Sequence, residues 1–427
     1  MHRTLIIGTC QAGVQLAAVL RELGDTDPIV MIGEEEHRPY QRPPLSKGWL
    51  KGELEPDDVI LRTRDWFAER DIELIAGDRV ATIRREPDGS GVAATLGGRS
   101  IPFTRLALTT GASVRRLPLP GTDYRGVYYL RHADDAIALG PALAEPGVER
   151  VAVIGGGFIG LEAAAAAREL GKAVTIVEGS GRLVGRVVAE QTSRFYHDAH
   201  VRRGTEIRLG ARIARIRGVD ASAAGHRGSV TGVELDDGTV VPADLVVIGI
   251  GVLPRTELAV QLGLDVDGGI VVDEACRTSD GRTVAAGDCT IMPNPYPRGT
   301  GGMVRIESVN NALEQAKIAA ATLLGQPARY ETVPWFWSDQ ADLKLQIAGL
   351  SAGYDDVVVR GDPDTEKFSV LYYREGRLIA ADCVNQPVEF MTVRHALMRG
   401  QDIPRAAAAD TGTPLKKSVR DAVTAAA

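Results

Sequence analysis

The chain has 427 residues, of which 44% are hydrophobic and 25% are charged, and its formal net charge is −7. This length can bury the cores of two or three domains, the composition is typical of a globular protein, and the acidic balance disfavours nucleic acid as a partner. The four cysteines form no C-x-x-C pair. We therefore expect no disulfide framework and a cytoplasmic location. The N-terminus runs straight into a predicted strand and no apolar run is long enough to span a bilayer, so we expect no signal peptide and no membrane anchor.

The first predicted elements form a strand–turn–helix–strand unit within "TLIIGTCQAGVQLAAVLRELGDTDPIVMIGEE". Gly8 and Gly13 bound the turn, and Glu34 closes the second strand. Cys10 stands where dinucleotide-binding loops usually have their middle glycine. At this point two interpretations remain open: a working dinucleotide site with an unusual residue, or a βαβ unit that has lost its ligand.

A second unit of the same kind lies in "RVAVIGGGFIGLEAAAAARELGKAVTIVEGS", with Gly155, Gly157 and Gly160 at the spacing G-x-G-x-x-G. The first glycine permits a tight turn, the second lets backbone approach a pyrophosphate, and the third lets helix and strand pack closely. The helix N-terminus offers free N–H groups to phosphates. Glu178 ends the following strand, where it can accept hydrogen bonds from a ribose and disfavour a 2′-phosphate. We expect NADH to bind here.

Each unit is followed by a β-rich insert and a buried return strand, and the pattern after about residue 325 changes to an antiparallel sheet followed by a helix. We therefore predict an α/β fold with two Rossmann-like dinucleotide-binding domains and a C-terminal α+β domain. The predicted boundaries are 1–112 with 244–324 for the first domain, 113–243 for the second and 325–427 for the third. Two dinucleotide sites in one chain favour a flavin enzyme with bound FAD and a visiting nicotinamide.

Six segments occur in an order that resembles one family: "RPYQRPPLSKGWL", "TTGASVRRLPLPG", "VIGGGFIGLEAAA", "AAGDC", "RIESVNNALEQAK" and "VPWFWSDQADLKLQIAGL". Together they look like the FAD-dependent, NADH-using ferredoxin reductases of bacterial oxygenase systems. The resemblance covers essentially the whole chain. It implies the two-dinucleotide architecture of glutathione reductase.

The resemblance implies a set of site residues. Lys47 near the reactive flavin edge, Glu162 paired with it, and Trp337 on the ferredoxin side are the expected catalytic residues. The other expected FAD-binding residues are Gly8, Cys10, Gly13, Glu34, Arg42, Pro44, Thr110, Gly111, Ala112, Asp288, Glu307, Ser308 and Val309. No metal site is expected. Cys10 is expected to be tolerated, with some loss of FAD affinity.

The implied reaction takes a hydride from NADH to FAD and passes single electrons to a [2Fe–2S] ferredoxin, which supplies a cytochrome P450 or a Rieske-type oxygenase. A rubredoxin is the alternative acceptor, and a slowly turning-over redox sensor resembling apoptosis-inducing flavoproteins is an alternative function. A scaffold that no longer holds FAD is a third possibility. The segment 39–50 contains no cysteine. This excludes enzymes like glutathione reductase, thioredoxin reductase and the related peroxidases, which need a redox-active cysteine pair or a single cysteine near the flavin. A monomer or weak homodimer is expected.

Overall fold

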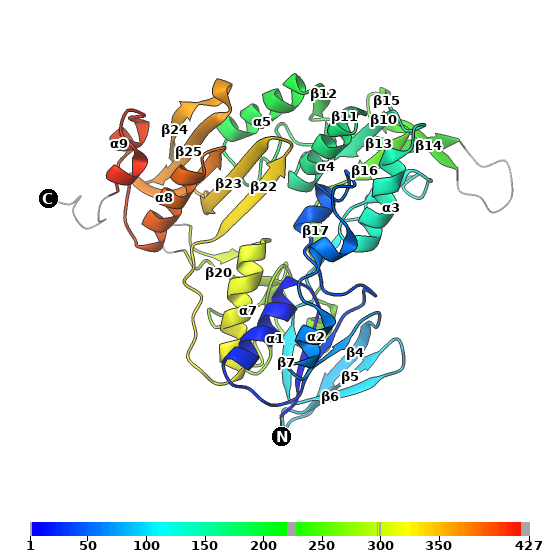
Figure 1. Ribbon diagram of the computed structural model, residues 1–427, viewed down its shortest axis with the longest axis vertical. Coiled ribbons are helices and arrows are strands. Elements are labelled where there is room, and N and C mark those ends of the chain that lie inside the picture. Colours follow the sequence, from blue (N-terminus) through cyan, green and yellow to red (C-terminus); the bar gives the residue numbers. More distant parts are fainter. Residues whose placement is uncertain (1, 220–227, 297, 299, 420–427) are drawn as a thin grey trace. The chain divides into compact units, whose positions relative to one another are not determined.

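The computed structural model describes residues 2–219, 228–296, 298 and 300–419. Its internal contacts divide the chain into two compact units, each assembled from separate segments (Figure 1). The first unit comprises Met1–Gln41, Pro56–Ser113 and Leu253–Phe336, and the second comprises Arg42–Glu55, Val114–Val252 and Trp337–Ala427.

The first unit is built on a five-stranded parallel sheet in the order β19-β7-β1-β2-β3. Its strands are β1 (Thr4–Ile7), β2 (Ile29–Ile32), β3 (Ile72–Ile75), β7 (Arg105–Leu108) and β19 (Val284–Ala285). Every residue of β1 and β2 is buried, as expected for strands with both faces covered. Helices α1 (Gln11–Glu22) and α7 (Val309–Leu323) pack side by side in this unit (Figure 1).

Smaller elements complete the first unit. They are α2 (Arg64–Ala68), α6 (Glu257–Gln261), the antiparallel strands β4 (Val80–Arg85), β5 (Gly91–Thr95) and β6 (Ser100–Phe103), and the strands β18 (Ile270–Val271), β20 (Thr290–Pro293) and β21 (Met303–Val304). The boundaries between the units fall at β8 (Ala112–Val114) and β17 (Val252–Pro254), at Pro56 and Trp337, and just before the short 3₁₀ helix η1 (Pro43–Ser46).

The second unit repeats the architecture with a parallel sheet in the order β12-β11-β10-β16-β9. Its strands are β9 (Val127–Tyr129), β10 (Arg150–Ile154), β11 (Ala173–Glu178), β12 (Thr205–Leu209) and β16 (Leu245–Ile248). Three helices, α3 (Ala133–Ala144), α4 (Phe158–Glu169) and α5 (Glu190–Arg202), and an antiparallel meander of β13 (Ile213–Val219), β14 (Ser229–Leu235) and β15 (Val240–Pro242) accompany it.

Three features differ from the predicted domain boundaries, one being that residues 325–336 cluster with the first unit and Trp337–Ala427 with the second. The prediction assigned residues from 244 onward to the first domain, but β16 pairs in parallel with β10, with Val151 opposite Leu245. The buried return strand therefore closes the sheet from which its own βαβ unit started. Residues 42–55, predicted in the first domain, cluster with the second unit. The assignment of three domains otherwise stays a prediction.

The C-terminal segment forms an antiparallel sheet in the order β22-β23-β26-β25-β24. Its elements are β22 (Trp335–Gln340), β23 (Leu343–Gly349), β24 (Asp356–Asp362), β25 (Lys367–Arg374), β26 (Arg377–Val384), α8 (Pro387–Met398) and α9 (Arg405–Ala409).

This sheet is fastened to α5 within the second unit. The Tyr372 hydroxyl accepts a hydrogen bond from the Ala189 amide at 2.7 Å and donates to Asp382. Thr192 on α5 donates to Asp382 Oδ2 at 2.7 Å. Asp382 is fully buried, so this carboxyl joins a strand and a helix inside the core.

The predicted fold class is confirmed by two parallel α/β sheets and a C-terminal antiparallel sheet. Among the described residues, no helix has both the length and the apolar character needed to span a bilayer.

Candidate dinucleotide and redox site

The first glycine turn joins β1 to α1 in a conformation that requires two glycines. Gly8 has φ of +119°, and a Cβ there would lie 2.0 Å from the Thr109 carbonyl oxygen. A Cβ at Gly13 would lie 2.0 Å from the Gly8 carbonyl oxygen. The contact between turn, helix and strand β7 therefore leaves no room for larger residues at these two positions.

Cys10 is the N-cap of α1 and has φ of −100° and ψ of −156°, an extended conformation that any L-residue adopts. Its thiol points to the Tyr40 carbonyl oxygen, with Sγ 3.7 Å away. The polypeptide itself therefore does not require glycine at this position.

The acid at the end of β2 lies beside a residue that the sequence analysis missed. Glu34 forms an ion pair with Arg255. The Arg255 backbone amide donates to the Gly111 carbonyl at 3.0 Å, and the Thr110 hydroxyl donates to the Arg255 carbonyl at 2.7 Å. Three predicted FAD-binding residues, Glu34, Thr110 and Gly111, thus meet around Arg255. Ala112 follows them at the start of β8 and is buried.

The N-terminus of α7 forms the other part of the first site. Ser308 is the N-cap and accepts a hydrogen bond from the Asn311 amide at 3.0 Å; Glu307 precedes it and Val309 begins the helix. Gln315, fully buried on α7, accepts from the Gly287 amide at 2.8 Å. This contact pins the turn that presents Asp288 in the same unit.

Two buried amide oxygens at this helix start are available to a ligand. Asn310 Oδ1 and Asn311 Oδ1 have no hydrogen-bond partner among the described residues, although both side chains are less than a tenth exposed. Buried polar atoms are normally satisfied, and a dinucleotide with a polar ring system offers donors for them. The N-terminus of α1 offers free N–H groups to phosphates, and the N-terminus of α7 carries the two asparagines. This arrangement fits FAD.

The second glycine turn, between β10 and α4, repeats the geometry of the first. Gly155 has φ of +107° with a Cβ position 2.4 Å from the Gly249 carbonyl oxygen, and a Cβ at Gly160 would lie 2.1 Å from the Gly155 carbonyl oxygen. Gly157 is the N-cap, with φ of −82°. No described chain atom lies within 4 Å of its Cβ position, so Gly157, like Cys10, is not demanded by chain packing.

Glu178 at the end of β11 is held against this turn. One carboxylate oxygen accepts from the Gly156 amide at 2.6 Å and the other accepts from the Ser180 amide at 2.6 Å. Arg182, four residues along, donates to the carbonyl groups of Gly185 and Val188. The guanidinium group of Arg182 therefore holds its own loop together. The side chain that the end of β11 presents to the turn is the acidic Glu178.

The predicted pairing of Lys47 with Glu162 is present in the second unit. Lys47 Nζ lies 2.8 Å from Glu162 Oε2, which also accepts from the Ser46 hydroxyl at 2.5 Å. The Glu162 side chain is 3% exposed and the Lys47 side chain 19%, so this is a largely buried charge pair. Pro43 and Pro44 begin η1 and fix φ where the chain turns to present Ser46 and Lys47.

Arg42, the N-cap of η1, donates to the Arg131 carbonyl at 2.7 Å and lies 3.1 Å from His132 Nδ1. It thus ties η1 to the start of α3. Trp337 is half-buried on β22 and adjoins Ser338, whose hydroxyl donates to Glu162 Oε1 at 2.6 Å. Lys47 and Glu162 are therefore in contact, and Ser338, the residue after Trp337, is bonded to Glu162. The roles of Lys47, Glu162 and Trp337 stay predictions.

Comparisons with known proteins place these features in context. The family model described as pyridine nucleotide-disulphide oxidoreductase matches residues 2–316, and the model described as reductase C-terminal matches residues 335–419. The chain is 41% identical to rhodocoxin reductase of Rhodococcus erythropolis, over 97% of this chain and 94% of the relative.

Two further similarities cover almost the full length. The ferredoxin reductase subunit of 5,5'-dehydrodivanillate O-demethylase of Sphingobium sp. is 40% identical, over 97% of each chain. The solved structure of the covalent putidaredoxin reductase–putidaredoxin complex contains a chain that matches with a TM-score of 0.91 and 38% identity, over 97% of each chain.

Proposed function

Because this chain belongs to the pyridine nucleotide-disulphide oxidoreductase family, we propose that it is an FAD-dependent NADH:ferredoxin oxidoreductase. The resemblance to bacterial ferredoxin reductases expected from the sequence is confirmed over the full length. The observation that carries the proposal is the doubled glycine turn with a carboxylate after each unit, at Glu34 and at Glu178. Two such sites serve a resident and a visiting dinucleotide.

FAD, when bound, supplies the chemistry that accepts a hydride and releases single electrons. The chain's own residues bind and orient it. In this proposal, the N-terminus of α1 binds the pyrophosphate. Glu34 gives up its ion pair with Arg255 and accepts hydrogen bonds from a ribose. At the start of α7, Asn310 and Asn311 accept hydrogen bonds from polar groups of the ring system.

We assign the second turn to NADH. Glu178 takes the ribose hydroxyls, and a 2′-phosphate would meet its negative charge. Arg182 could have relieved that repulsion, but its guanidinium is engaged by two backbone carbonyl groups. This supports a preference for NADH over NADPH.

Lys47 is assigned a charge-stabilising role. A cation stabilises the negative charge that develops on a flavin when it is reduced. This effect is strongest where water is largely excluded. The carboxylate of Glu162 fixes the position of the ammonium group. Trp337 is assigned to the route by which electrons leave, as the family resemblance implies, since a half-buried aromatic side chain offers a polarizable path.

Disulfide chemistry does not fit the three buried cysteines. All four are unpaired thiols in the described part of the chain. Burial raises the pKa of Cys276, Cys289 and Cys383, which keeps them protonated and poor nucleophiles. Unpaired thiols also support the proposed cytoplasmic location.

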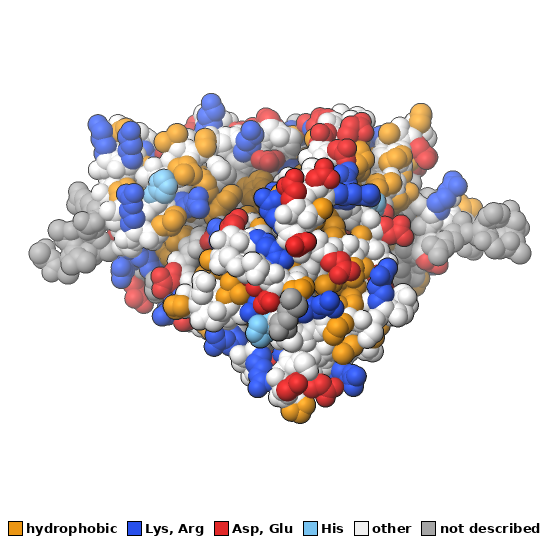
Figure 2. All heavy atoms as spheres, turned by 60° about the horizontal axis from the view of Figure 1, so that its bottom comes forward, with side chains coloured by type: hydrophobic (Ala, Val, Ile, Leu, Met, Phe, Trp, Pro, Cys, Tyr) orange, Lys and Arg blue, Asp and Glu red, His pale blue; other side chains and the backbone are white. Residues whose placement is uncertain are grey.

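The proposed acceptor is a [2Fe–2S] ferredoxin that feeds a cytochrome P450 or a Rieske-type oxygenase. Figure 2 shows basic and acidic side chains interspersed over the face drawn. This chain has a net charge of −7, so docking of the acidic ferredoxin that the resemblance implies would need a local group of basic side chains, and such steering weakens as salt screens it.

The test combines a spectrum with a coupled assay. The purified protein should carry flavin absorption, lose it with NADH, and reduce cytochrome c rapidly only when a [2Fe–2S] ferredoxin is added. Replacing the ferredoxin by rubredoxin tests the alternative acceptor. A protein without flavin bands, or one that NADH reduces but no iron–sulfur or rubredoxin acceptor reoxidises, contradicts the proposal.

A further inference from the structure

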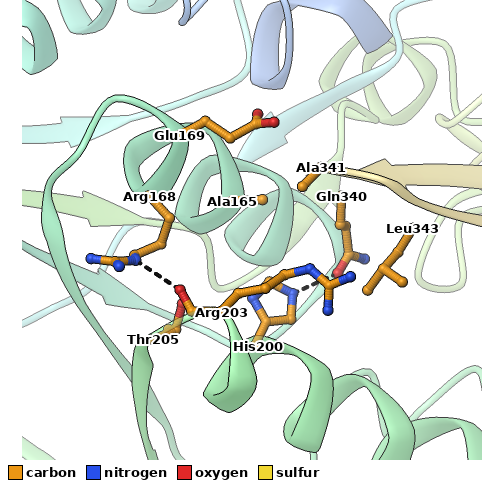
Figure 3. A pocket seen from close by; sticks show the side chains of 9 residues that line it. All are labelled: Ala165, Arg168, Glu169, His200, Arg203, Thr205, Gln340, Ala341 and Leu343. Carbon is orange, nitrogen blue, oxygen red and sulfur yellow. Dashed lines mark hydrogen bonds between the residues drawn. The ribbon is translucent and has the colours of Figure 1, made fainter. Parts of the chain in front are cut away.

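A line of buried polar side chains leads away from the Lys47–Glu162 pair. Gln340 Nε2 donates to the Ser338 hydroxyl at 3.2 Å, and Gln340 Oε1 lies 2.8 Å from His200 Nε2. Figure 3 shows the contact between His200 and Gln340. The side chains of Glu162, Ser338, Gln340 and His200 are 3%, 0%, 1% and 3% exposed, so the whole line is shielded from solvent.

The hydrogen bonds in this line all point in one direction. The Gln340 amide group donates to Ser338, which leaves its carbonyl oxygen facing the imidazole. A carbonyl oxygen only accepts, so His200 Nε2 carries the proton. The single proton of Ser338 then goes to Glu162 Oε1 at 2.6 Å. Each group donates toward the carboxylate, and bonds in such a chain strengthen one another.

The two oxygens of Glu162 therefore have separate partners. Oε1 takes Ser338, while Oε2 takes Ser46 and Lys47. If Oε1 loses its donor, one buried carboxylate oxygen is unsatisfied and the carboxylate can rotate to share the donors of Oε2. Either outcome weakens the bond that places the ammonium group of Lys47.

We propose that His200 and Gln340 are positioning residues that act through Ser338 to hold Glu162, and with it Lys47, in place. The importance of Lys47 rests on the proposed function. The positioning of Lys47 through this line of hydrogen bonds does not depend on it. Neither residue is adjacent in sequence to either member of the charge pair.

A neighbouring cavity makes the test practicable. His200 and Gln340 line a cavity of about 260 Å³ with Ala165, Leu343 and Arg203 (Figure 3). The space and the apolar neighbours allow leucine at position 200 without a clash. His200→Leu removes the donor, His200→Gln restores an N–H donor, and His197→Leu, on the more exposed side of α5, is the matched control.

The first readout is chemical labelling of Lys47, which does not depend on turnover. The purified protein and its variants are treated briefly with acetic anhydride, and acetylation of Lys47 is measured by peptide mass spectrometry relative to Lys317, which lies in α7. We expect His200→Leu to raise the relative labelling of Lys47 about three- to tenfold, the range of one lost hydrogen bond. His200→Gln and His197→Leu should stay within about twofold.

The second readout is flavin reduction by NADH in stopped flow. We expect His200→Leu to lower the limiting rate about tenfold while the NADH dissociation constant stays within about twofold. Ser338→Ala, which deletes one oxygen, should reproduce both effects and serves if the leucine variant does not fold.

Unchanged Lys47 labelling in folded His200→Leu, or equal effects of His200→Gln and His200→Leu, would overturn the inference. Failure of the wild type to reduce ferredoxin would overturn the proposed function instead, and the labelling result would still decide the positioning role.

Discussion

Replacing Asp382 by asparagine should change how the stability of the protein depends on pH. Burial raises the pKa of Asp382 to about 7, whereas an aspartate in an unfolded chain titrates near 3.9. Between these values the folded state keeps a proton that the unfolded state has lost. Stability therefore falls as pH rises through this window, and the penalty is complete above about pH 7.

The size of the effect follows from the shift. Three units at about 1.4 kcal/mol each amount to about 4 kcal/mol, of which about 3 kcal/mol falls between pH 5 and pH 8. Asparagine can still accept from Tyr372 and Thr192 but cannot ionise. Its amide group replaces Oδ1, which has no partner among the described residues, and burying that donor costs about 1–3 kcal/mol at every pH.

The measurement is urea unfolding of wild type and Asp382→Asn at several pH values between 5 and 8, with hydrogen exchange of peptides from β25 and β26 to assign the change to the second unit. The free energy of unfolding of the variant minus that of wild type should rise by about 3 kcal/mol across this range. Asp236→Asn, an exposed control, should show a difference within about 0.5 kcal/mol. A constant difference for Asp382→Asn would mean that the native carboxyl is already ionised at pH 5, and the reasoning would be refuted.

Four functional predictions accompany this one. Lys47→Ala should slow flavin reduction by NADH about 10²-fold without loss of FAD; an unchanged stopped-flow rate would make the lysine structural only. The wild type should prefer NADH to NADPH by about 10² in kcat/KM, because Glu178 opposes a 2′-phosphate, and equal values for the two cofactors would contradict this. Cys10→Gly should slow FAD dissociation, measured by flavin fluorescence; faster dissociation would show that the thiol contact with Tyr40 favours binding. Ferredoxin reduction should slow as ionic strength rises while ferricyanide reduction changes little, and a flat profile would exclude docking through a basic patch.

The glycines show what a sequence pattern can predict. The first and last glycine of each turn were expected to be architectural, and backbone atoms do approach to within about 2.0–2.4 Å of where their Cβ atoms would be. The middle position differs. Cys10 and Gly157 are both N-caps with negative φ, so only a ligand can demand glycine there. A cysteine at the middle position of "GTCQAG" is therefore compatible with the fold.

The residues that the sequence analysis missed are those whose partners are distant in the chain. Arg255 meets Glu34, and Gln340 meets His200, across separations that no local pattern encodes. One signal was present: in β22 the buried positions are the polar residues Ser338 and Gln340. Polar side chains on the inward side of a strand need buried partners, and alternation alone could have indicated that they belong to a network.

The division of the chain into six alternating segments means that the backbone passes between the two units five times. No single cut can release either unit with all its parts, so limited proteolysis should give nicked, associated fragments and not separable domains. Gene fusion or truncation at one point could not exchange one of the two proposed nucleotide sites for another. Exchanging the segment Val114–Val252, which carries the second glycine turn, would therefore need two breakpoints in the chain.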